Sequence, residues 1–290
     1  MTLAIVWNPV TVDDPNELRA ELKRRDVGSD LLWLETTEDD PGAGQTRHAL
    51  DAGAEMLVVC GGDGTVAACA GVLAGTGVPM ALVPTGTGNL LVRNLGLPLD
   101  VPTALDRAFS ADRRTVDLLD VGGRRFTVMA GMGFDAALIR DTGEQAKKRY
   151  GWVAYVAAGM GALRNTPRAH YELRVDASAP RRIRALGVLV GNVGELQGGM
   201  AVLPDADPSD GLVDVIVIAP RGWLDVVLLA WRILRRRPDK GPQALIAQGR
   251  RIEIRAGRLV PVEFDGDYAG EQETLTVTVL PGAVTICGAR

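Results

Sequence analysis

Short runs of consecutive apolar residues alternate with segments of helical periodicity in the first part of the chain. The apolar runs lie at residues 3–7, 31–34, 56–60 and 80–83, and the helix-like segments at 15–25, 45–52, 65–74 and 101–110. Unbroken apolar runs are typical of strands that are buried on both faces. Strands that alternate with helices predict a parallel sheet flanked by helices.

The pattern changes beyond residue 112. Residues 113–120 and 124–130 face each other across a Val-Gly-Gly turn and predict a hairpin. A helical region is predicted at 150–164. Strands divided by turns follow at 171–175, 183–190, 212–218, 252–255, 260–264, 275–279 and 284–287. This second part of the chain favours an antiparallel β-sandwich.

The two patterns predict an α/β protein of two domains, an α/β domain at 1–121 and a β-sandwich domain at 122–290. A chain of 290 residues is long enough for two cores. Its composition, 47% apolar and 23% charged residues, is that of an ordinary globular protein. The net charge of −4 argues against a nucleic-acid partner, since such proteins usually carry a strongly basic face.

Cysteine and histidine exclude several kinds of site. The three cysteines, Cys60, Cys69 and Cys287, have no metal-ligand spacing and form no disulfide framework, which favours the reducing cytosol. With only His48 and His170, no histidine metal cluster is available. No apolar run reaches the roughly 18 residues that span a bilayer, so we expect neither an exported nor an integral membrane protein.

The strand at 56–60 runs directly into the sequence Gly-Gly-Asp-Gly-Thr at residues 61–65. Glycines let the backbone turn sharply and approach a ligand closely, as in a phosphate site. An acid inside such a loop, Asp63, suggests a bound metal ion. The alternative is a plain strand-to-helix connection in which Asp63 caps the helix.

A second glycine turn, Pro-Thr-Gly-Thr-Gly-Asn at residues 84–89, follows the strand at 80–83. It offers backbone N–H groups and the hydroxyl of Thr87. Turns that follow successive parallel strands converge at one edge of the sheet, where ligands bind. No Gly-Lys-Ser/Thr is present, which excludes a P-loop NTPase. The turn also lacks the third glycine of the dinucleotide fingerprint, which weakens a dehydrogenase interpretation.

Together with Asn8-Pro9, these two turns resemble the motifs of the diacylglycerol kinase catalytic-domain superfamily. Further matches are Val-Asp-Leu at 116–118, Gly-Met-Gly-Phe-Asp at 131–135, Asp-Pro-Ser-Asp-Gly-Leu at 207–212 and Phe-Asp-Gly-Asp at 264–267. The chain resembles the soluble bacterial lipid kinases of that group, related to diacylglycerol and sphingosine kinases, over nearly its whole length. The resemblance implies an N-terminal domain like those of phosphofructokinases and NAD kinases, and ATP and Mg²⁺ as cofactors.

The resemblance also implies roles for individual residues. It places ATP against Asn8, Thr36, Thr37, Gly61, Gly62, Asp63, Gly64, Thr65, Thr87 and Asn89. Asp63 would bind Mg²⁺ with support from Asp117, and Asp267 would accept the proton of the alcohol, so Asp63 and Asp267 are the expected catalytic residues. A second, structural Mg²⁺ would be held by Asp207, Asp210 and Leu212.

Three departures from the family pattern affect this expectation. Asp267 stands where the family has a glutamate, Leu90 where many members have an aspartate, and Ala67-Ala68 where Asn-Glu is frequent. Simpler interpretations also exist: residues 265–267 as a plain hairpin turn, and residues 207–212 as a turn rich in Asp, Pro, Ser and Gly.

A helix is predicted from Trp223 to Arg237, with tryptophans on an apolar face and arginines at its end. It is a candidate for peripheral contact with anionic lipid headgroups. Equally, it fits a core-packed amphipathic helix whose arginines are favoured by the helix dipole. We expect a cytoplasmic protein that reaches the inner face of the membrane, and the sequence leaves a homodimer open.

The leading hypothesis is an ATP- and Mg²⁺-dependent lipid kinase that transfers the γ-phosphate of ATP to the hydroxyl of a lipid such as diacylglycerol. One alternative is an NAD kinase-like enzyme, which shares the Gly-Gly-Asp-Gly-Thr loop but differs in the second glycine turn. Another is a catalytically inactive regulator that binds nucleotide or lipid, prompted by Leu90, Ala67-Ala68 and Asp267.

Overall fold

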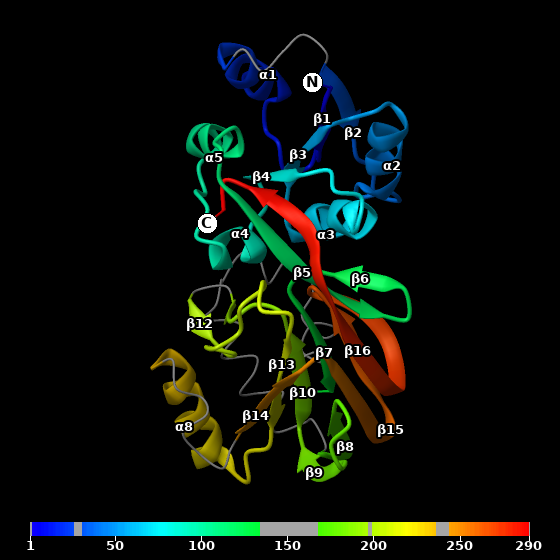
Figure 1. The fold of residues 1–290 in the computed structure, drawn as a ribbon. Coiled ribbons are helices and arrows are strands. Elements are labelled where there is room, and N and C mark those ends of the chain that lie inside the picture. Colours follow the sequence, from blue (N-terminus) through cyan, green and yellow to red (C-terminus); the bar gives the residue numbers. More distant parts are fainter. Residues whose placement is uncertain (1, 26–30, 134–167, 197–198, 236–243, 290) are drawn as a thin grey trace. The chain divides into compact units, whose positions relative to one another are not determined.

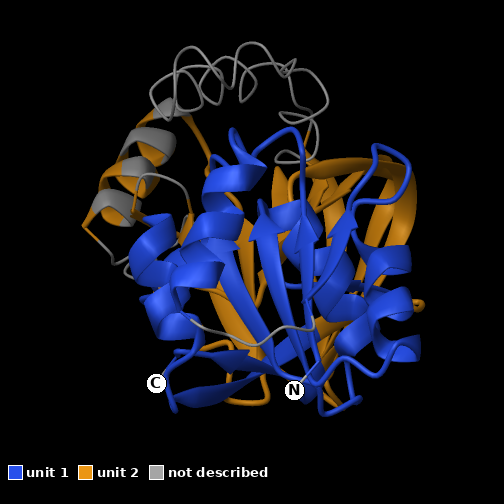
Figure 2. Ribbon diagram, turned by 90° about the horizontal axis from the view of Figure 1, so that it is seen from above, with its two compact units in different colours: residues 1–118, 124–127, 280–290 blue, residues 119–123, 128–279 orange. Residues whose placement is uncertain are grey.

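The computed structural model describes residues 2–25, 31–133, 168–196, 199–235 and 244–289 (Figure 1). The predicted helix at 150–164 lies outside these residues. The chain forms two compact units, coloured blue and orange in Figure 2. Unit 1 comprises residues 1–118, 124–127 and 280–290, and unit 2 comprises 119–123 and 128–279.

Unit 1 is built around a parallel sheet, as predicted. Its strands are β1 (Leu3–Trp7), β2 (Leu31–Glu35), β3 (Met56–Gly61) and β4 (Met80–Pro84). They lie in the order β2-β1-β3-β4, and each pairing is parallel. Every residue of β1, β3 and β4 is buried. Both faces of these strands are covered, which explains why their sequences are continuously apolar.

Helices cover both faces of this sheet. They are α1 (Pro15–Arg24), α2 (Ala43–Asp51), α3 (Asp63–Leu73), the short α4 (Leu90–Asn94) and α5 (Val101–Ala108). Leu18 and Leu22 of α1 share a core cluster with Leu105 of α5 and with β1 and β3. Asp14 and Asp100 cap α1 and α5, because their side chains accept hydrogen bonds from backbone N–H groups of the first turn.

The last strand of the chain completes the sheet of unit 1. It is the final part of β16 (Asp267–Cys287), which lies parallel to β4 with Ile286 beside Met80. Gly75 N–H donates to Ala283 O at 2.9 Å, and Cys287 belongs to the core cluster. The compact units therefore differ from the predicted division after residue 121, since residues 280–290 belong to unit 1.

The predicted hairpin after residue 112 is partly wrong. Strand β5 (Arg113–Val121) pairs with β6, but β6 is only Arg124–Phe126. Residues 129–133 form a separate strand, β7 (Met129–Gly133), which pairs with other strands of unit 2. The chain leaves the hairpin because the N–H groups of Val128 and Met129 both donate to the carboxylate of Asp265, each at 2.9 Å.

Unit 2 is an antiparallel assembly, as predicted. Its further strands are β8 (Ala169–Val175), β9 (Arg181–Ala185), β10 (Gly187–Gly191), β11 (Glu195–Leu196), β12 (Met200–Ala201), β13 (Val213–Ile218), β14 (Ala244–Gly249) and β15 (Arg251–Phe264). Strands β14, β13, β10, β7, β15 and β16 lie in that order, and β8 pairs with both β15 and β9.

Several strand boundaries in unit 2 differ from the prediction. The single strand predicted at 183–190 is two strands, β9 and β10, which pair with different neighbours. The pairs predicted at 252–255 and 260–264, and at 275–279 and 284–287, each merge into one long strand. Strand β15 keeps its continuity through a register shift between Arg255 and Val260. Strand β14 was not predicted.

The predicted helix from Trp223 is present as α8 (Trp223–Leu234), shown in gold in Figure 1. The predicted end at Arg237 lies outside the described residues. Within the part of the chain that the structure describes, no helix is both long and apolar enough to cross a membrane.

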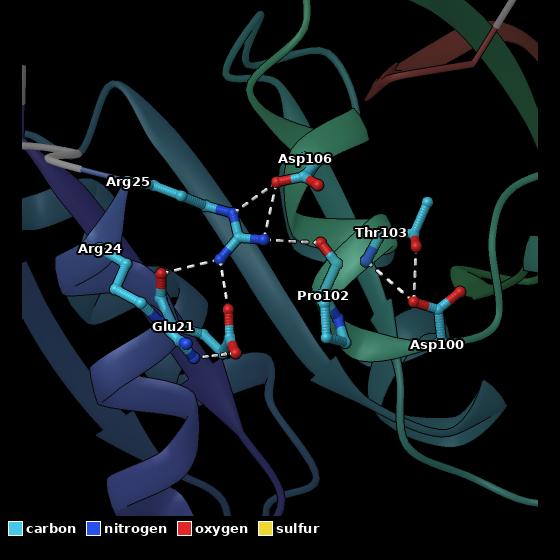
Figure 3. Close-up of polar contacts among 7 residues, drawn as sticks. All are labelled: Glu21, Arg24, Arg25, Asp100, Pro102, Thr103 and Asp106. Atoms are coloured by element: carbon cyan, nitrogen blue, oxygen red, sulfur yellow. Dashed lines mark hydrogen bonds and ion pairs between the residues drawn. The ribbon is translucent and has the colours of Figure 1, made fainter.

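Arg25 joins α1 to α5 in unit 1 (Figure 3). Its guanidinium contacts Glu21 Oε2 at 2.6 Å and Asp106 Oδ1 at 2.7 Å, and donates to Pro102 O at 2.8 Å. The Arg25 side chain is 17% exposed. The neighbouring Arg24 also pairs with Glu21, but its side chain is 65% exposed. The two arginines therefore share one acid and differ in burial.

Replacing Arg25 by methionine should lower the free energy of unfolding by about 1–2 kcal/mol, because Glu21, Asp106 and Pro102 lose a charged donor. Arg24→Met is the matched control and should change it by less than about 0.5 kcal/mol, since exposed ion pairs contribute little. Urea unfolding of both variants measures the difference. Equal losses would contradict the inferred link between α1 and α5.

Candidate functional site

The first glycine loop joins β3 to α3. Gly61 ends the strand and Gly62 is the N-cap residue of α3, in an extended conformation with φ −96° and ψ −170°. Asp63, Gly64 and Thr65 form the first turn of the helix. N–H groups in the first turn of a helix have no partner within the helix, and with the helix dipole they attract anions. The loop therefore has the local geometry of a phosphate site.

The second glycine turn is in direct backbone contact with the first. Thr85 N–H donates to Gly61 O at 3.2 Å. A Cβ atom added to Gly86 would lie 2.4 Å from Gly62 Cα, and one added to Gly62 would lie 3.3 Å from Gly86 Cα. No side chain fits between the two turns. The predicted convergence of the two loops at one sheet edge is thus present in unit 1.

Asp63 fastens the two loops together. Its Oδ1 accepts a hydrogen bond from Leu90 N–H at 2.6 Å, at the start of α4. Burial raises the pKa of Asp63, and hydrogen bonds from the N–H groups of Leu90, Leu91 and Asn89 oppose that rise. A Cβ on Gly88 would lie 2.5 Å from Asp63 Oδ2. The carboxylate therefore caps α4. The simpler expectation, that Asp63 caps its own helix, is wrong, because the N-cap of α3 is Gly62 without a side-chain hydrogen bond.

Asn89 is the last residue of the second turn and the N-cap residue of α4. It is 7% exposed and adopts the left-handed conformation, with φ 49°, which asparagine tolerates better than most residues. Its Nδ2 donates to Gly86 O at 2.7 Å. Its Oδ1 is buried and has no hydrogen-bond partner in the described structure. A buried acceptor without a partner is a place for a donor group of a ligand or for water.

Asn8 reaches the first glycine loop from the end of β1. Its backbone N–H donates to Cys60 O at 2.9 Å, and its Nδ2 donates to Thr65 Oγ1 at 3.4 Å. Asn8 Oδ1 accepts from Val10 N–H at 2.9 Å. Three chain segments therefore meet at this edge: the loop after β1, the loop after β3 and the turn after β4.

The other predicted residues of unit 1 are placed as follows. Thr36 follows β2, is 3% exposed and donates its backbone N–H to Trp7 O. The hydroxyl of Thr37 accepts from Asp40 N–H at 3.1 Å, and Thr87 is exposed. Asp117 lies on β5, is 2% exposed and accepts from Gly282 N–H at 2.6 Å. Asp117 thus holds the turn that precedes the last strand segment.

Three residues of this edge were not predicted as site residues. The hydroxyls of Thr11 and Thr85 are hydrogen-bonded to each other at 2.8 Å, which links the loops after β1 and β4. Arg93 Nε donates to Gly88 O at 2.9 Å, and its charge is a further influence that opposes the rise in the pKa of Asp63 caused by burial. Two sequence signals could have found them: hydroxyl residues in the loops that follow β1 and β4, and a cation in the short helix after the glycines.

Asp267 belongs to a tight hairpin in unit 2. Asp265 and Gly266 both have positive φ, 49° and 89°, and connect β15 to β16 with Phe264 paired to Asp267. Positive φ at both central residues is the mark of a type I′ turn. Glu263 Oε2 accepts from Gly266 N–H at 2.7 Å. The plain-turn interpretation is therefore correct for the backbone, and it leaves the side chain of Asp267 exposed at the first position of β16.

The predicted structural metal residues form a compact turn before β13. Asp207 Oδ1 accepts from Ser209 N–H at 3.0 Å, and Asp210 Oδ1 accepts from Leu212 N–H at 2.8 Å. Burial raises the pKa of the nearby Asp214 to about 7, and Asp210 and Asp205 add repulsion. Among the described residues, no group of three or more His, Cys, Asp or Glu side chains is arranged to hold a metal ion.

Known proteins match both parts of the chain. Residues 12–121 match the diacylglycerol kinase catalytic domain, and residues 128–288 match the YegS C-terminal NAD kinase β-sandwich-like domain. A probable YegS-like lipid kinase of Pseudomonas fluorescens is 33% identical over 93% of this chain and 90% of its own length.

The chain belongs to the YegS-like lipid kinase family. It is therefore a kinase of the lipid kinase group, and both the predicted family and the predicted β-sandwich are confirmed. A diacylglycerol kinase of Mycobacterium tuberculosis is also 33% identical, over 60% of this chain and 59% of its own length.

Solved structures agree on the fold. A putative diacylglycerol kinase from Bacillus anthracis has a TM-score of 0.81 at 20% identity and covers 99% of this chain and 94% of its own. An NAD kinase from Archaeoglobus fulgidus, solved in complex with ATP, has a TM-score of 0.54 at 15% identity. The match covers 99% of this chain and 93% of the NAD kinase chain. The predicted likeness to the NAD kinase fold is thus confirmed.

Gly86→Ala should lower the free energy of unfolding by about 1–3 kcal/mol, because its methyl group overlaps the backbone of Gly62. Gly64→Ala is the matched control: a Cβ at residue 64 meets nothing within 4 Å. The free energy of unfolding of this control should rise by no more than about 1 kcal/mol, because alanine is a better helix former than glycine. Urea unfolding curves compare the two. Equal stability of both variants would contradict the backbone contact.

Asp63→Ala should lower the free energy of unfolding by about 1–2 kcal/mol and speed hydrogen exchange at Leu90 N–H, because α4 loses its cap. Asp63→Asn keeps a carbonyl acceptor and should lose less. Hydrogen exchange and urea unfolding measure both effects. Unchanged exchange at Leu90 in the alanine variant would show that the bond to Asp63 is not formed in solution.

Proposed function

We propose that the protein transfers the γ-phosphate of ATP to the hydroxyl of a lipid such as diacylglycerol, with Mg²⁺ as cofactor. One observation carries the proposal: the two glycine turns are in backbone contact, and the first of them includes the first turn of α3, whose N–H groups have no partner within the helix. Phosphoryl transfer depends mainly on positioning and on neutralisation of charge, which backbone donors and a metal ion can supply.

In this proposal the nucleotide lies on unit 1. The backbone N–H groups of residues 61–65 bind its phosphates, as expected for a helix N-terminus. Asn8, Thr36, Thr37, Thr65, Thr87 and Asn89 are the further nucleotide-binding residues. The buried Oδ1 of Asn89 supports this assignment, because it is an acceptor in the second turn that lacks a hydrogen-bond partner in the described structure.

The donor set of unit 1 fits Mg²⁺ that is bound together with ATP. Mg²⁺ in phosphate-transfer sites usually takes one or two carboxylates and completes its shell with phosphate oxygens and water. Asp63 offers one carboxylate beside the phosphate loop, and Asp117 is the proposed supporting acid. Bound there, the ion would neutralise negative charge on the phosphates. Asp207, Asp210 and Leu212 remain the proposed holders of a structural Mg²⁺.

We further propose that Asp267 accepts the proton of the lipid hydroxyl. Its side chain is exposed, so it is open to a substrate. The hairpin that carries it is fixed by Asp265, which accepts two backbone hydrogen bonds, and by the carboxylate of Glu263. Because the aspartate side chain is one methylene shorter than that of glutamate, the proton transfer in this proposal needs a closer approach of the hydroxyl or a bridging water. The proposal includes a cytoplasmic location, with membrane contact through α8, and leaves a homodimer open.

A vesicle phosphorylation screen tests the reaction. Purified protein is incubated with labelled ATP, Mg²⁺ and vesicles that contain diacylglycerol, monoacylglycerol, sphingosine or undecaprenol, and labelled lipid is the expected product. Formation of NADP from NAD and ATP without labelled lipid would favour the NAD kinase-like alternative. Binding of ATP without any product would identify the inactive regulator.

Asp267→Asn should lower the rate of lipid phosphorylation by about 10²–10⁴-fold, because general-base catalysis is lost. Glu273→Gln, an exposed acid on the same strand, is the matched control and should keep the rate within about twofold of the unmodified enzyme. Radiolabelled product from the preferred lipid measures both. Full activity of the asparagine variant would remove Asp267 from the mechanism.

A further inference from the structure

Helix α8 of unit 2 exposes one apolar face. Leu224 is 58% exposed, Leu228 43% and Trp231 52%. Spacings of four and three residues place these side chains on the same side of a helix. Leu229, in contrast, is 6% exposed. The helix therefore buries part of its surface and leaves a separate apolar face uncovered, which the core-packed interpretation of the sequence does not explain.

Positive charge adjoins the apolar face at the C-terminal end of α8. The guanidinium of Arg235 lies over the ring of Trp231, 4.7 Å from its centroid. Arg232 occupies the last turn of the helix, and the sequence continues with Arg236 and Arg237, which lie outside the described residues. The helical acid Asp225 is at the opposite end, where its Oδ2 accepts from Arg221 N–H at 2.8 Å.

We propose that the face formed by Leu224, Leu228, Trp231 and Arg235 lies on the surface of an anionic membrane. Tryptophan and leucine side chains enter the boundary between headgroups and acyl chains, and arginines bind lipid phosphates. Helix α8 has 12 residues, fewer than the roughly 20 that span a bilayer, so the orientation is along the surface. The inference rests on the proposed function, because a lipid kinase must reach a substrate that is held in the bilayer.

Charge decides between a membrane and a second copy of the chain as the partner. Arg235 lies at one end of the apolar face, over the ring of its exposed tryptophan. An anionic lipid surface carries negative charge over its whole area. It can therefore neutralise the arginine whichever way the helix is turned in the plane of the membrane. Within Trp223–Leu234, the acid is Asp225, which lies in the first turn, at the opposite end of the helix from Arg235, and caps that end. The described part of α8 therefore offers no acid beside Trp231 to receive the arginine of a second copy.

Vesicle co-sedimentation tests the inference. The full-length protein is mixed with vesicles of phosphatidylcholine alone and with vesicles that also contain phosphatidylglycerol. We expect binding to the anionic vesicles, and a decrease of about tenfold in the partition coefficient for Leu228→Ser combined with Trp231→Ser, and separately for Arg235→Glu. Circular dichroism and urea unfolding verify that each variant is folded.

Matched controls come from the same unit. Leu259 is 57% exposed on β15, and Arg184 is exposed on β9. Leu259→Ser and Arg184→Glu should bind anionic vesicles within about twofold of the unmodified protein. The inference is overturned if the α8 variants bind like these controls, if the unmodified protein does not bind, or if the α8 variants change only the association state seen by analytical ultracentrifugation.

A second assay separates this inference from the proposed kinase activity. With diacylglycerol dispersed in detergent, the α8 variants should phosphorylate lipid at the rate of the unmodified enzyme, since no bilayer is needed. Loss of activity in detergent would show that α8 is needed for catalysis itself rather than for membrane binding, and would overturn the inference. Vesicle binding through α8 without phosphorylation of any lipid would instead refute the proposed function and leave the membrane surface intact.

Discussion

The backbone contact between Gly62 and Gly86 is the constraint on which the candidate site depends. Because neither glycine carries a Cβ atom, the loop after β3 and the turn after β4 can approach closely enough for Asp63 to reach the first N–H group of α4. That bond fixes the start of α4, and α4 in turn carries Arg93 back to Gly88. In the described structure, the role of Asp63 is therefore to hold together the two loops of the candidate site.

The sheet of unit 1 and the position of its loops could be predicted because the strands are buried on both faces. Continuous apolar runs then mark the strands, and parallel order brings their carboxyl ends to one edge. The partners of the side chains could not be predicted. The bond from Asp63 to Leu90 depends on a helix of five residues, and the pair Thr11 and Thr85 joins loops that are 74 positions apart. Such contacts follow from tertiary register, which periodicity does not contain.

Unit 2 was harder to predict for a related reason. Long antiparallel strands tolerate irregular register, so β15 and β16 continue through positions where the sequence indicated breaks. Conversely, β9 and β10 meet at Leu186 without turn residues between them, and only their different neighbours divide them. The hairpin at Asp265 and Gly266 was recognisable, because Asp-Gly is favoured where both residues need positive φ. The hydrogen bonds that Asp265 of this hairpin accepts at the start of β7 could not be predicted.

Strand β16 has a consequence for the order of events during synthesis. Its final segment fills the place beside β4 and contributes Cys287 to the core of unit 1, although the residues of unit 2 are translated first. While the ribosome is still making unit 2, the β4 edge of the parallel sheet has no neighbour on that side. An open strand edge invites mispairing. The parallel sheet of unit 1 is therefore complete only after the final segment of β16 has been synthesised and has paired with β4.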